Sequence, residues 1–315
     1  MKVLHLRRQC ARDQTVATGE PRRRIETYYD QTWKDYRFLW LNGQNLAFHF
    51  GYHDASTRTH AAALLNTNRT LAARAAIQAG HRVLDAGCGV GGSGLWLARH
   101  CQAEVVGVTL VRSQVLQACQ LAVTQGLAQH AVFVQADYTR TPFPNASFDA
   151  VWALESLCHA LDKASFYREA ARLLRPGGHL VVAEYMRAAR PLSEFGERMV
   201  REWLDGWAIP DLDTPDEHLT HATAAGLASV TLENFTSRAR PSLRRLYRIA
   251  VASYPFALTA RLLRMRSATQ HGNVIAALRQ FQALERGLWL YGVVSATKSL
   301  FPNMPEDRQP SSDNR

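Results

Sequence analysis

Cysteine is scarce in this chain, and long apolar runs are absent from it. The five cysteines lie far apart with no Cys-x-x-Cys pair, so neither a zinc site nor a disulfide framework is indicated. No cluster of His, Cys and Asp has the spacing of metal ligands, so no metal is expected. No run reaches the roughly 18 apolar residues of a membrane span, and the N-terminus lacks the apolar stretch of a signal peptide. We therefore expect a cytoplasmic protein.

Acidic residues are also few. The chain has 27 Asp and Glu against 37 Lys and Arg, a net charge of +10. Arginines crowd residues 22–24 and 238–266, where the simplest interpretation is the solvated faces of helices. An alternative is peripheral contact between these basic C-terminal helices and an anionic membrane, because arginines interleave with Leu243, Leu246, Tyr247, Ile249 and Val251. Residues 1–24 and 306–315 are polar and unpatterned, and are expected to be disordered tails.

Glycine, in contrast, is concentrated in one loop. The apolar pair Val83-Leu84 leads through Asp85 into Gly87-Cys88-Gly89-Val90-Gly91-Gly92, and an amphipathic helix follows. Glycines let the backbone turn sharply and approach a ligand closely, and a helix N-terminus adds free N–H groups. The loop also fits the dinucleotide fingerprint, which requires an acidic residue about 20 residues further on. Residues 106–109 read Val-Gly-Val-Thr, without an acid, so a dinucleotide cofactor is disfavoured.

Beyond the loop, apolar runs alternate with helical patterns, which is typical of a parallel sheet with helices on both faces. Later strands at 230–235 and 290–297 are expected to pair at the sheet edge, and the segments around them at 187–225 and 238–288 are expected to be helical. An apolar stripe from Val274 to Trp289 favours packing within a helical cap. Strands are expected at 83–86, 105–108, 132–134, 150–154 and 180–183.

Four ordered signals resemble the class I S-adenosylmethionine-dependent methyltransferases. They are the Asp-x-Gly-x-Gly-x-Gly loop, Ala136-Asp137-Tyr138, Phe148-Asp149-Ala150-Val151 and Leu174-Arg175-Pro176-Gly177-Gly178. The resemblance implies a Rossmann-like α/β fold with a mostly parallel seven-stranded sheet and a helical cap, and S-adenosyl-L-methionine as cofactor.

The same resemblance assigns roles to individual residues. Asp85 anchors the loop or reaches the cofactor's ammonium group, and Asp137 accepts a hydrogen bond from the adenine amino group. Residues 105–110 with Gln114 resemble the cyclopropane fatty-acid synthase branch, in which Thr and Gln replace a ribose-binding carboxylate. The cofactor-binding residues implied are Tyr29, Asp85, Gly87, Gly89, Gly91, Thr109, Leu110, Gln114, Asp137 and Tyr138.

A second resemblance, over most of residues 28–230, is to sterol C-24 methyltransferases. Tyr28-Tyr29-Asp30, residues 47–52 and Glu155-Ser156-Leu157-Cys158-His159-Ala160 carry it, whereas residues 38–43 and 236–288 depart from the pattern. Tocopherol and bacterial natural-product methyltransferases are similar too. The resemblance implies a lipophilic acceptor, sterol- or isoprenoid-like, that is methylated on carbon. The alternative is O- or N-methylation of a tocopherol-, quinone- or polyketide-like acceptor.

One domain is expected over residues 25–300. It divides into an aromatic lid at 25–60, a cofactor-binding core at 80–186, a helical cap at 187–288 and a final strand at 289–300. Residues 28–52 contain nine aromatic side chains, which either close over the cofactor as a lid or form ordinary core.

His159 and Glu155, just after the fourth expected strand, are the candidate catalytic residues, with Glu184 as a further one. A hydroxyl acceptor needs a base during methyl transfer, whereas an alkene acceptor needs one only afterwards. Structural roles compete with both: His159 as a packed imidazole, and Glu155 as a residue that holds the lid. Base-flipping nucleic-acid methyltransferases are expected to carry Asn/Asp-Pro-Pro-aromatic at this place, where the chain has Leu154-Glu155-Ser156-Leu157, so no nucleic-acid partner is expected.

Overall fold

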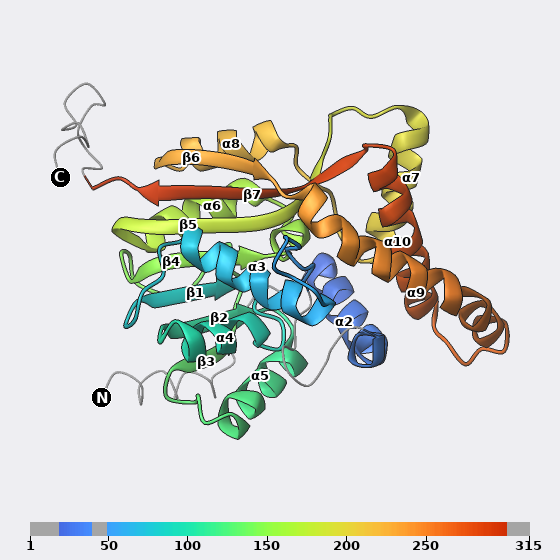
Figure 1. The fold of residues 1–315 in the computed structure, drawn as a ribbon, viewed down its shortest axis with the longest axis horizontal. Coiled ribbons are helices and arrows are strands. Elements are labelled where there is room, and N and C mark those ends of the chain that lie inside the picture. The colour runs from blue at the N-terminus through green and yellow to red at the C-terminus, as the bar shows by residue number, and fades with distance from the viewer. Residues whose placement is uncertain (1–18, 40–48, 301–315) are drawn as a thin grey trace.

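A seven-stranded sheet forms the centre of the protein in the computed structural model, which describes residues 19–39 and 49–300 (Figure 1). The strand order is β3-β2-β1-β4-β5-β7-β6, and only β7 runs antiparallel to its neighbours. The strands are β1 Arg82–Ala86, β2 Glu104–Thr109, β3 Ala131–Gln135, β4 Phe148–Leu154, β5 Leu174–Arg187, β6 Leu227–Asn234 and β7 Trp289–Lys298. This is the Rossmann-like α/β fold that the sequence predicted.

Helices cover both faces because successive side chains of a strand point to opposite sides of the sheet. Val83 and Val105 pack on one side with α3 (His60–Arg74), α4 (Gly92–His100) and α5 (Arg112–Thr124). Leu84 and Val106 pack on the other with α6 (Lys163–Leu173) and α8 (Pro215–Ala224). The strands are therefore buried on both faces, as near-continuous apolar runs require.

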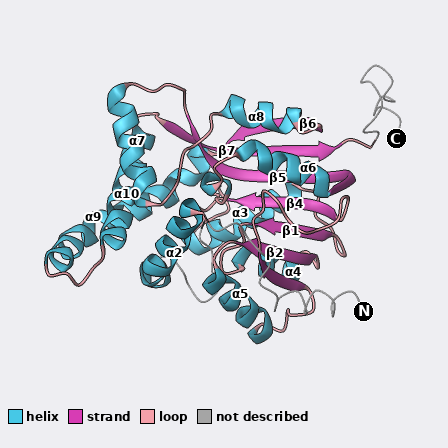
Figure 2. Ribbon diagram, turned by 180° about the vertical axis from the view of Figure 1, so that it is seen from behind, coloured by secondary structure: helices cyan, strands magenta, loops and turns pink. Residues whose placement is uncertain are grey.

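A cap of four helices lies at the carboxyl ends of the parallel strands (Figures 1 and 2). It consists of α2 (Glu20–Leu39), α7 (Glu194–Gly206), α9 (Thr236–Leu262) and α10 (Ala268–Glu285). Helix α10 contacts the other three, and α9 projects beyond the rest of the molecule. The stripe on α10 faces inward, since Val274, Phe281 and Leu284 are buried. Ligands of open α/β sheets bind at this end of the strands.

Two of the predicted boundaries differ from those in the structure. Helix α2 begins at Glu20, so residues 20–24 belong to a helix and not to the polar tail. Strand β5 begins at Leu174 and includes the Pro-Gly-Gly segment. The two late strands pair at one edge of the sheet, as predicted, with β7 between β5 and β6. Residues 1–18 and the predicted tail at 306–315 lie outside the described residues.

Candidate active site

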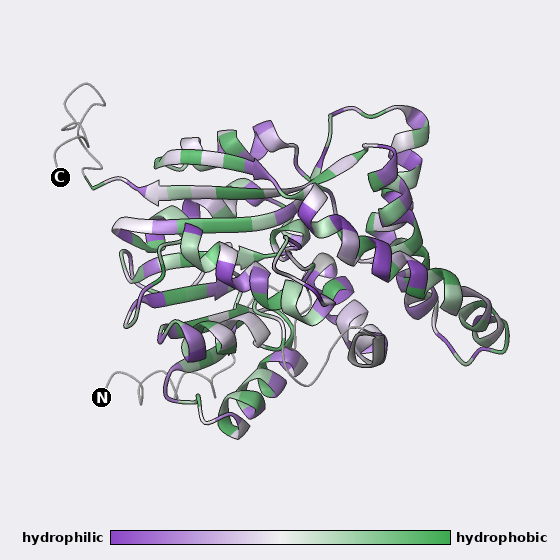
Figure 3. Cartoon of the chain, in the orientation of Figure 1, coloured by the Kyte–Doolittle hydropathy of each residue, from purple (hydrophilic) through white to green (hydrophobic). Residues whose placement is uncertain are grey.

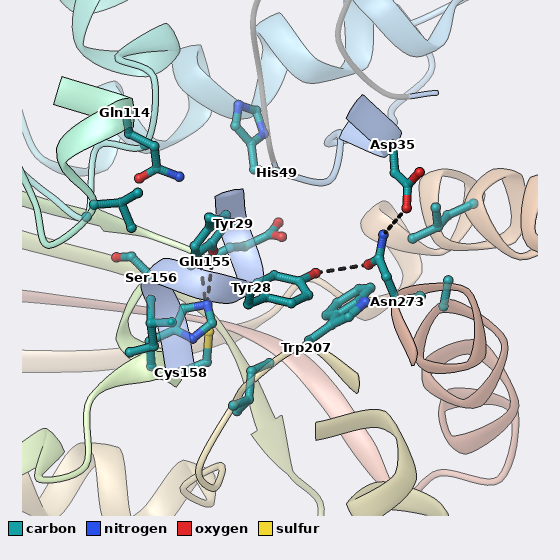
Figure 4. A pocket seen from close by; sticks show the side chains of 18 of the residues that line it. Tyr28, Tyr29, Asp35, His49, Gln114, Glu155, Ser156, Cys158, Trp207 and Asn273 are labelled. Carbon is teal, nitrogen blue, oxygen red and sulfur yellow. Dashed lines mark hydrogen bonds between the residues drawn. The ribbon is translucent and has the colours of Figure 1, made fainter. Parts of the chain in front are cut away.

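A cavity of about 720 Å³ lies between the carboxyl ends of β1, β2 and β4 and the helices α2, α9 and α10. The glycine loop and the turn after β2 form one end of it. Side chains of α9 and α10 form the other end, and Figure 4 shows Tyr29 and Glu155 between the two. His159 also lines the cavity. One cavity therefore adjoins both the loop predicted for the cofactor and an apolar region.

The glycine loop needs its glycines for different reasons. Gly87, Gly89 and Gly91 all have positive φ angles, of 84°, 53° and 84°. The backbone N–H groups of Gly87 and Cys88 both donate to the Val108 carbonyl, which ties the loop to β2. Gly87 and Gly89 line the cavity, and Gly91 does not. A Cβ on Gly91 would lie 2.7 Å from Cζ of Phe133, so this glycine is required by packing beneath the loop.

Substitution of Gly87 tests how closely the backbone of this loop approaches the Ser156 side chain. A Cβ there would lie 2.2 Å from the Ser156 Cβ, whereas one on Gly126, which also has a positive φ, meets nothing within 4 Å. We expect Gly87→Ala to lower the free energy of unfolding by about 3 kcal/mol, from overpacking plus backbone strain, and Gly126→Ala by about 1 kcal/mol, from strain alone. Urea unfolding measures both. Equal losses would show that the Ser156 contact is relieved without cost.

Asp85 ends β1 beneath the loop and is only 2% exposed. Its Oδ2 atom has no hydrogen-bond partner in the part of the chain that the structure describes. Burial raises the pKa of Asp85 to about 7, although a hydrogen bond from the Gly94 backbone opposes the shift. A buried carboxylate is costly unless an opposite charge faces it. A ligand with a cationic group fits this position.

Thr109 and Gln114 are joined by a hydrogen bond from the Thr109 hydroxyl to Oε1 of Gln114, at 2.8 Å. Both side chains are buried, and both line the cavity together with Leu110. The bond leaves the Gln114 amide N–H groups as donors toward the cavity. The structure thus brings together the pair that the sequence proposed in place of a ribose carboxylate.

Asp137 and Tyr138 differ in what they face. Tyr138 lines the cavity and donates from its hydroxyl to the Ser156 carbonyl, at 2.8 Å. Asp137 does not line the cavity, and its Oδ1 accepts from the backbone N–H and the hydroxyl of Thr139, at 2.8 and 2.6 Å. In this structure the carboxylate of Asp137 therefore caps the turn after β3.

Glu155 is the centre of a buried cluster. Its carboxyl group accepts from the Phe50 backbone N–H at 2.6 Å, from the Tyr291 hydroxyl at 2.7 Å and from the Tyr185 hydroxyl. Burial nevertheless raises the pKa of Glu155 to about 8, so near neutral pH the group carries its proton. The carboxyl group connects the segment around Phe50 to β5 and β7. Glu184 is fully buried beside this cluster and accepts from the Cys158 backbone N–H at 2.8 Å, which fixes the turn after β4.

His159 lies on a short 3₁₀ helix, Leu157–His159, and faces α2 across the cavity. Its Nε2 is 3.0 Å from the Tyr29 hydroxyl, and its Nδ1 is 3.4 Å from the Ala208 carbonyl oxygen. Burial lowers the pKa of His159 to about 4. The imidazole is therefore neutral at physiological pH and is able to accept a proton.

A polar network lies at the far end of the cavity, and nothing in the sequence pattern pointed to it. Tyr28 donates from its hydroxyl to Oδ1 of Asn273 at 2.9 Å, and Asn273 donates to Asp35 at 3.3 Å (Figure 4). Arg266 forms an ion pair with Asp35 at 2.7 Å. All four residues line the cavity. They come from α2, α10 and the turn between α9 and α10, so only the folded cap brings them together.

The hydroxyl groups of Tyr185 and Tyr291 were missed as partners of Glu155. These tyrosines are register partners in the antiparallel pair β5–β7. Predicting the register of that pair from the sequence would have identified them as neighbours. Tyr28, Tyr29 and Phe50 of the predicted lid line the cavity, while Tyr52 packs against Phe235. The side chains of Tyr36, Phe38, Trp40 and Phe48 lie outside what the structure describes.

Three comparisons identify the protein family. Residues 84–182 match the family model of a methyltransferase domain. The 27-O-demethylrifamycin SV methyltransferase of Amycolatopsis mediterranei (strain S699) is 36% identical over 205 residues, which cover 65% of this chain and 73% of that protein. Sterol methyltransferase-like 1 of Botryococcus braunii is 33% identical over 192 residues, 60% of this chain and 48% of that protein. The chain belongs to the class I S-adenosylmethionine-dependent methyltransferases.

The solved structures agree with this fold. The crystal structure of the [4+2]-cyclase SpnF superimposes with a TM-score of 0.74 and 23% identity, covering 92% of this chain and all of that one. A likeness at this identity shows the fold alone. The family establishes the enzyme as a methyltransferase with S-adenosylmethionine as its cofactor. The orphaned Oδ2 of Asp85 beneath the loop fits that cofactor, which supplies an activated methyl group when bound.

Residues 19–39 and 49–300, which the structure describes, contain neither a candidate metal site nor a candidate membrane span. No group of three or more His, Cys, Asp or Glu side chains in these ranges is arranged to hold a metal ion. None of the helices in the same ranges is both long and apolar enough to cross a membrane.

Proposed function

We propose that this enzyme transfers the methyl group of S-adenosylmethionine to a carbon atom of a lipophilic small molecule, sterol- or isoprenoid-like. The observation that carries the proposal is the apolar lining of the cavity beyond the candidate cofactor residues. Its walls there are the side chains of Leu246, Ile249, Ala250 and Ala257 from α9, Val274 and Ala277 from α10, and the rings of Phe50, Tyr185 and Trp207.

Aromatic rings suit a reaction that passes through a cation. When an alkene carbon attacks the methyl carbon, the bond from methyl to sulfur breaks and the positive charge moves to the acceptor. The rings of Phe50 and Trp207 line the cavity, and aromatic rings stabilise a cation that lies close to them. A neighbouring C–H bond then loses its proton to a base and the double bond is restored.

The ionisation of the two candidate residues favours His159 as that base. Near neutral pH the carboxyl group of Glu155 is protonated, since its pKa is about 8, while the imidazole of His159 is neutral. A base whose conjugate acid has a pKa of about 4 removes a proton from a carbocation readily, and from a hydroxyl group with a pKa of about 10 poorly. We assign Glu155 the role of holding the aromatic wall together through Tyr185 and Tyr291.

The polar network at the far end supports an acceptor with one oxygen on an apolar skeleton. Tyr28 and Asn273 offer a hydroxyl group and an amide there, within an otherwise apolar region. O-methylation of a tocopherol-, quinone- or polyketide-like acceptor is the second candidate. The hydrogen bond between Tyr29 and His159 supports it, because it holds a neutral imidazole, which can accept a proton, at the wall of the cavity.

Radiolabelled S-adenosylmethionine tests the acceptor class. We expect label to pass to a sterol with a side-chain double bond and to remain on carbon, and not to pass to a prenylated hydroquinone or a hydroxylated macrolide. Ile249→Asn, in the apolar wall, should lower kcat/KM for the sterol at least tenfold, because it places an amide in that wall. Leu116→Asn, on the exposed surface of α5, is the control. Label found only on oxygen would contradict C-methylation.

We also propose that the enzyme works in the cytoplasm in peripheral contact with a membrane. A lipophilic acceptor partitions into lipid, and the net charge of +10 attracts the enzyme to anionic lipid surfaces. The basic C-terminal helices are the part of the chain richest in arginine.

A further inference from the structure

Exposed apolar side chains gather at the far end of α9. Among the described residues eleven large apolar side chains are exposed, and six of them lie in residues 251–265, which we call the α9 tip. Single exposed apolar residues are ordinary, whereas a cluster marks an interaction surface. The six are Val251, Phe256, Leu258, Leu262, Leu263 and Met265, between 37% and 78% exposed.

The stretch of chain that contains the α9 tip carries charge of one sign. Residues 234–284 contain no Asp or Glu, and they contain nine arginines. Arg261 and Arg264 are exposed among the apolar residues of the tip, and neither forms an ion pair with any residue that the structure describes. The tip thus combines apolar side chains with uncompensated positive charge, the combination that binds anionic membrane surfaces.

The tip overlaps the stretch that the sequence pattern indicated only at Val251. Leu243 and Ala250 are buried, and Tyr247 packs on Phe281 of α10 with ring centroids 4.9 Å apart. The first half of α9 is therefore part of the cap. Only the second half projects from the molecule, where Figure 3 shows hydrophobic and hydrophilic residues side by side at its end.

We propose that the α9 tip inserts into the headgroup layer of an anionic lipid bilayer and opens the active-site cavity toward it. Phe256 and Met265 are exposed, at 78% and 77%, and both also line the cavity. The mouth of the cavity therefore lies at the tip, and a lipophilic acceptor passes from lipid to the active site without crossing water. This entry route rests on the proposed acceptor class, whereas the docking of the tip does not.

A second copy of the chain is a less suitable occupant of the same surface. In a two-fold symmetric contact the same patch meets itself, so Arg261 and Arg264 of each copy would approach those of the other. The described part of the patch offers no acidic side chain to compensate them. An anionic bilayer supplies the missing negative charge.

Sedimentation with lipid vesicles tests the docking. We expect the protein to bind vesicles of phosphatidylcholine with phosphatidylglycerol, to bind pure phosphatidylcholine at least tenfold more weakly, and to dissociate as salt is raised. Arg261→Gln with Arg264→Gln should weaken vesicle binding by about 30-fold, at roughly fivefold for each arginine. Leu262→Ser with Leu263→Ser should weaken it at least tenfold, through lost apolar burial.

Control variants distinguish vesicle binding by the α9 tip from non-specific binding by exposed apolar side chains elsewhere on the protein. Leu116→Ser with Leu161→Ser removes apolar side chains of similar exposure elsewhere, and should leave vesicle binding unchanged. Unchanged binding of S-adenosylhomocysteine confirms that each variant is folded.

The proposal is overturned if the wild-type chain does not bind anionic vesicles, or if the tip variants bind as it does. A dimer that Leu262→Ser with Leu263→Ser dissociates, without vesicle binding, would assign the surface to a second copy. Vesicle binding without transfer to any lipophilic acceptor would overturn the proposed function and leave the docking.

Discussion

Replacement of Asp85 by asparagine is expected to weaken the binding of S-adenosylhomocysteine about 100-fold at pH 8. The carboxylate is buried with an unpartnered Oδ2, so an ammonium group of the ligand would be its opposite charge. Removing one partner of such a buried pair costs about 3 kcal/mol, which corresponds to that factor. Isothermal titration calorimetry measures the affinity. Asp149→Asn, at the other end of the sheet, where the carboxylate holds the Arg82 backbone and Arg175, should leave it unchanged.

The pH dependence of binding gives a second measure of the same assignment. The pKa of Asp85 is raised to about 7, so below pH 7 the carboxyl group is neutral and must release a proton to bind a cation. The affinity of the wild-type enzyme should therefore fall by up to tenfold for each pH unit below 7 and level off above it. Asp85→Asn should abolish this slope. A slope that survives the substitution, or an unchanged affinity in the folded variant, would remove Asp85 from the cofactor site.

Replacement of His159 by glutamine is expected to lower turnover about 100-fold while S-adenosylhomocysteine still binds. Glutamine keeps a polar group within reach of Tyr29 and removes the proton acceptor, and general bases contribute at least this factor. If the acceptor is methylated on carbon, double-bond isomers or water-quenched alcohols should appear among the products. Mass spectrometry of the products and steady-state kinetics measure both effects.

Two further measurements distinguish catalysis from packing. His218 is also buried, with its pKa lowered to about 3, but it pairs with Tyr167 outside the cavity, so His218→Gln should leave the turnover of folded enzyme unchanged. Because the pKa of His159 is about 4, the base becomes protonated only in acid, and kcat should begin to fall near pH 4. If kcat instead begins to fall near pH 6.5, or if His159→Gln keeps the turnover and the products of the wild type, His159 is a structural residue.

The candidate cofactor residues could be predicted where their signals are local in sequence. The positive φ angles at Gly87 and Gly89 need glycine, and the strand, loop and helix around them follow one another without interruption. Thr109 and Gln114 are five residues apart, so the turn after β2 suffices to bring them together. Asp137 also follows its strand, yet its carboxylate faces a turn, because side-chain direction depends on local hydrogen bonds that the pattern does not encode.

The sequence by itself determined the order of strands and helices, the sheet with both faces covered, the glycine loop and the class of cofactor. The strands, helices and loop follow from periodicity and from backbone preferences, which act over a few residues. The class of cofactor follows from the resemblance of the loop and the later motifs to a known family. Only the tertiary structure decided what surrounds Glu155, since its donors come from residues 50, 185 and 291. It also decided which half of α9 is buried, because both halves carry apolar side chains and only the packing of α10 distinguishes them. The tertiary structure also decided the pKa values of Asp85, Glu155 and His159, because burial shifts them and burial depends on the whole fold.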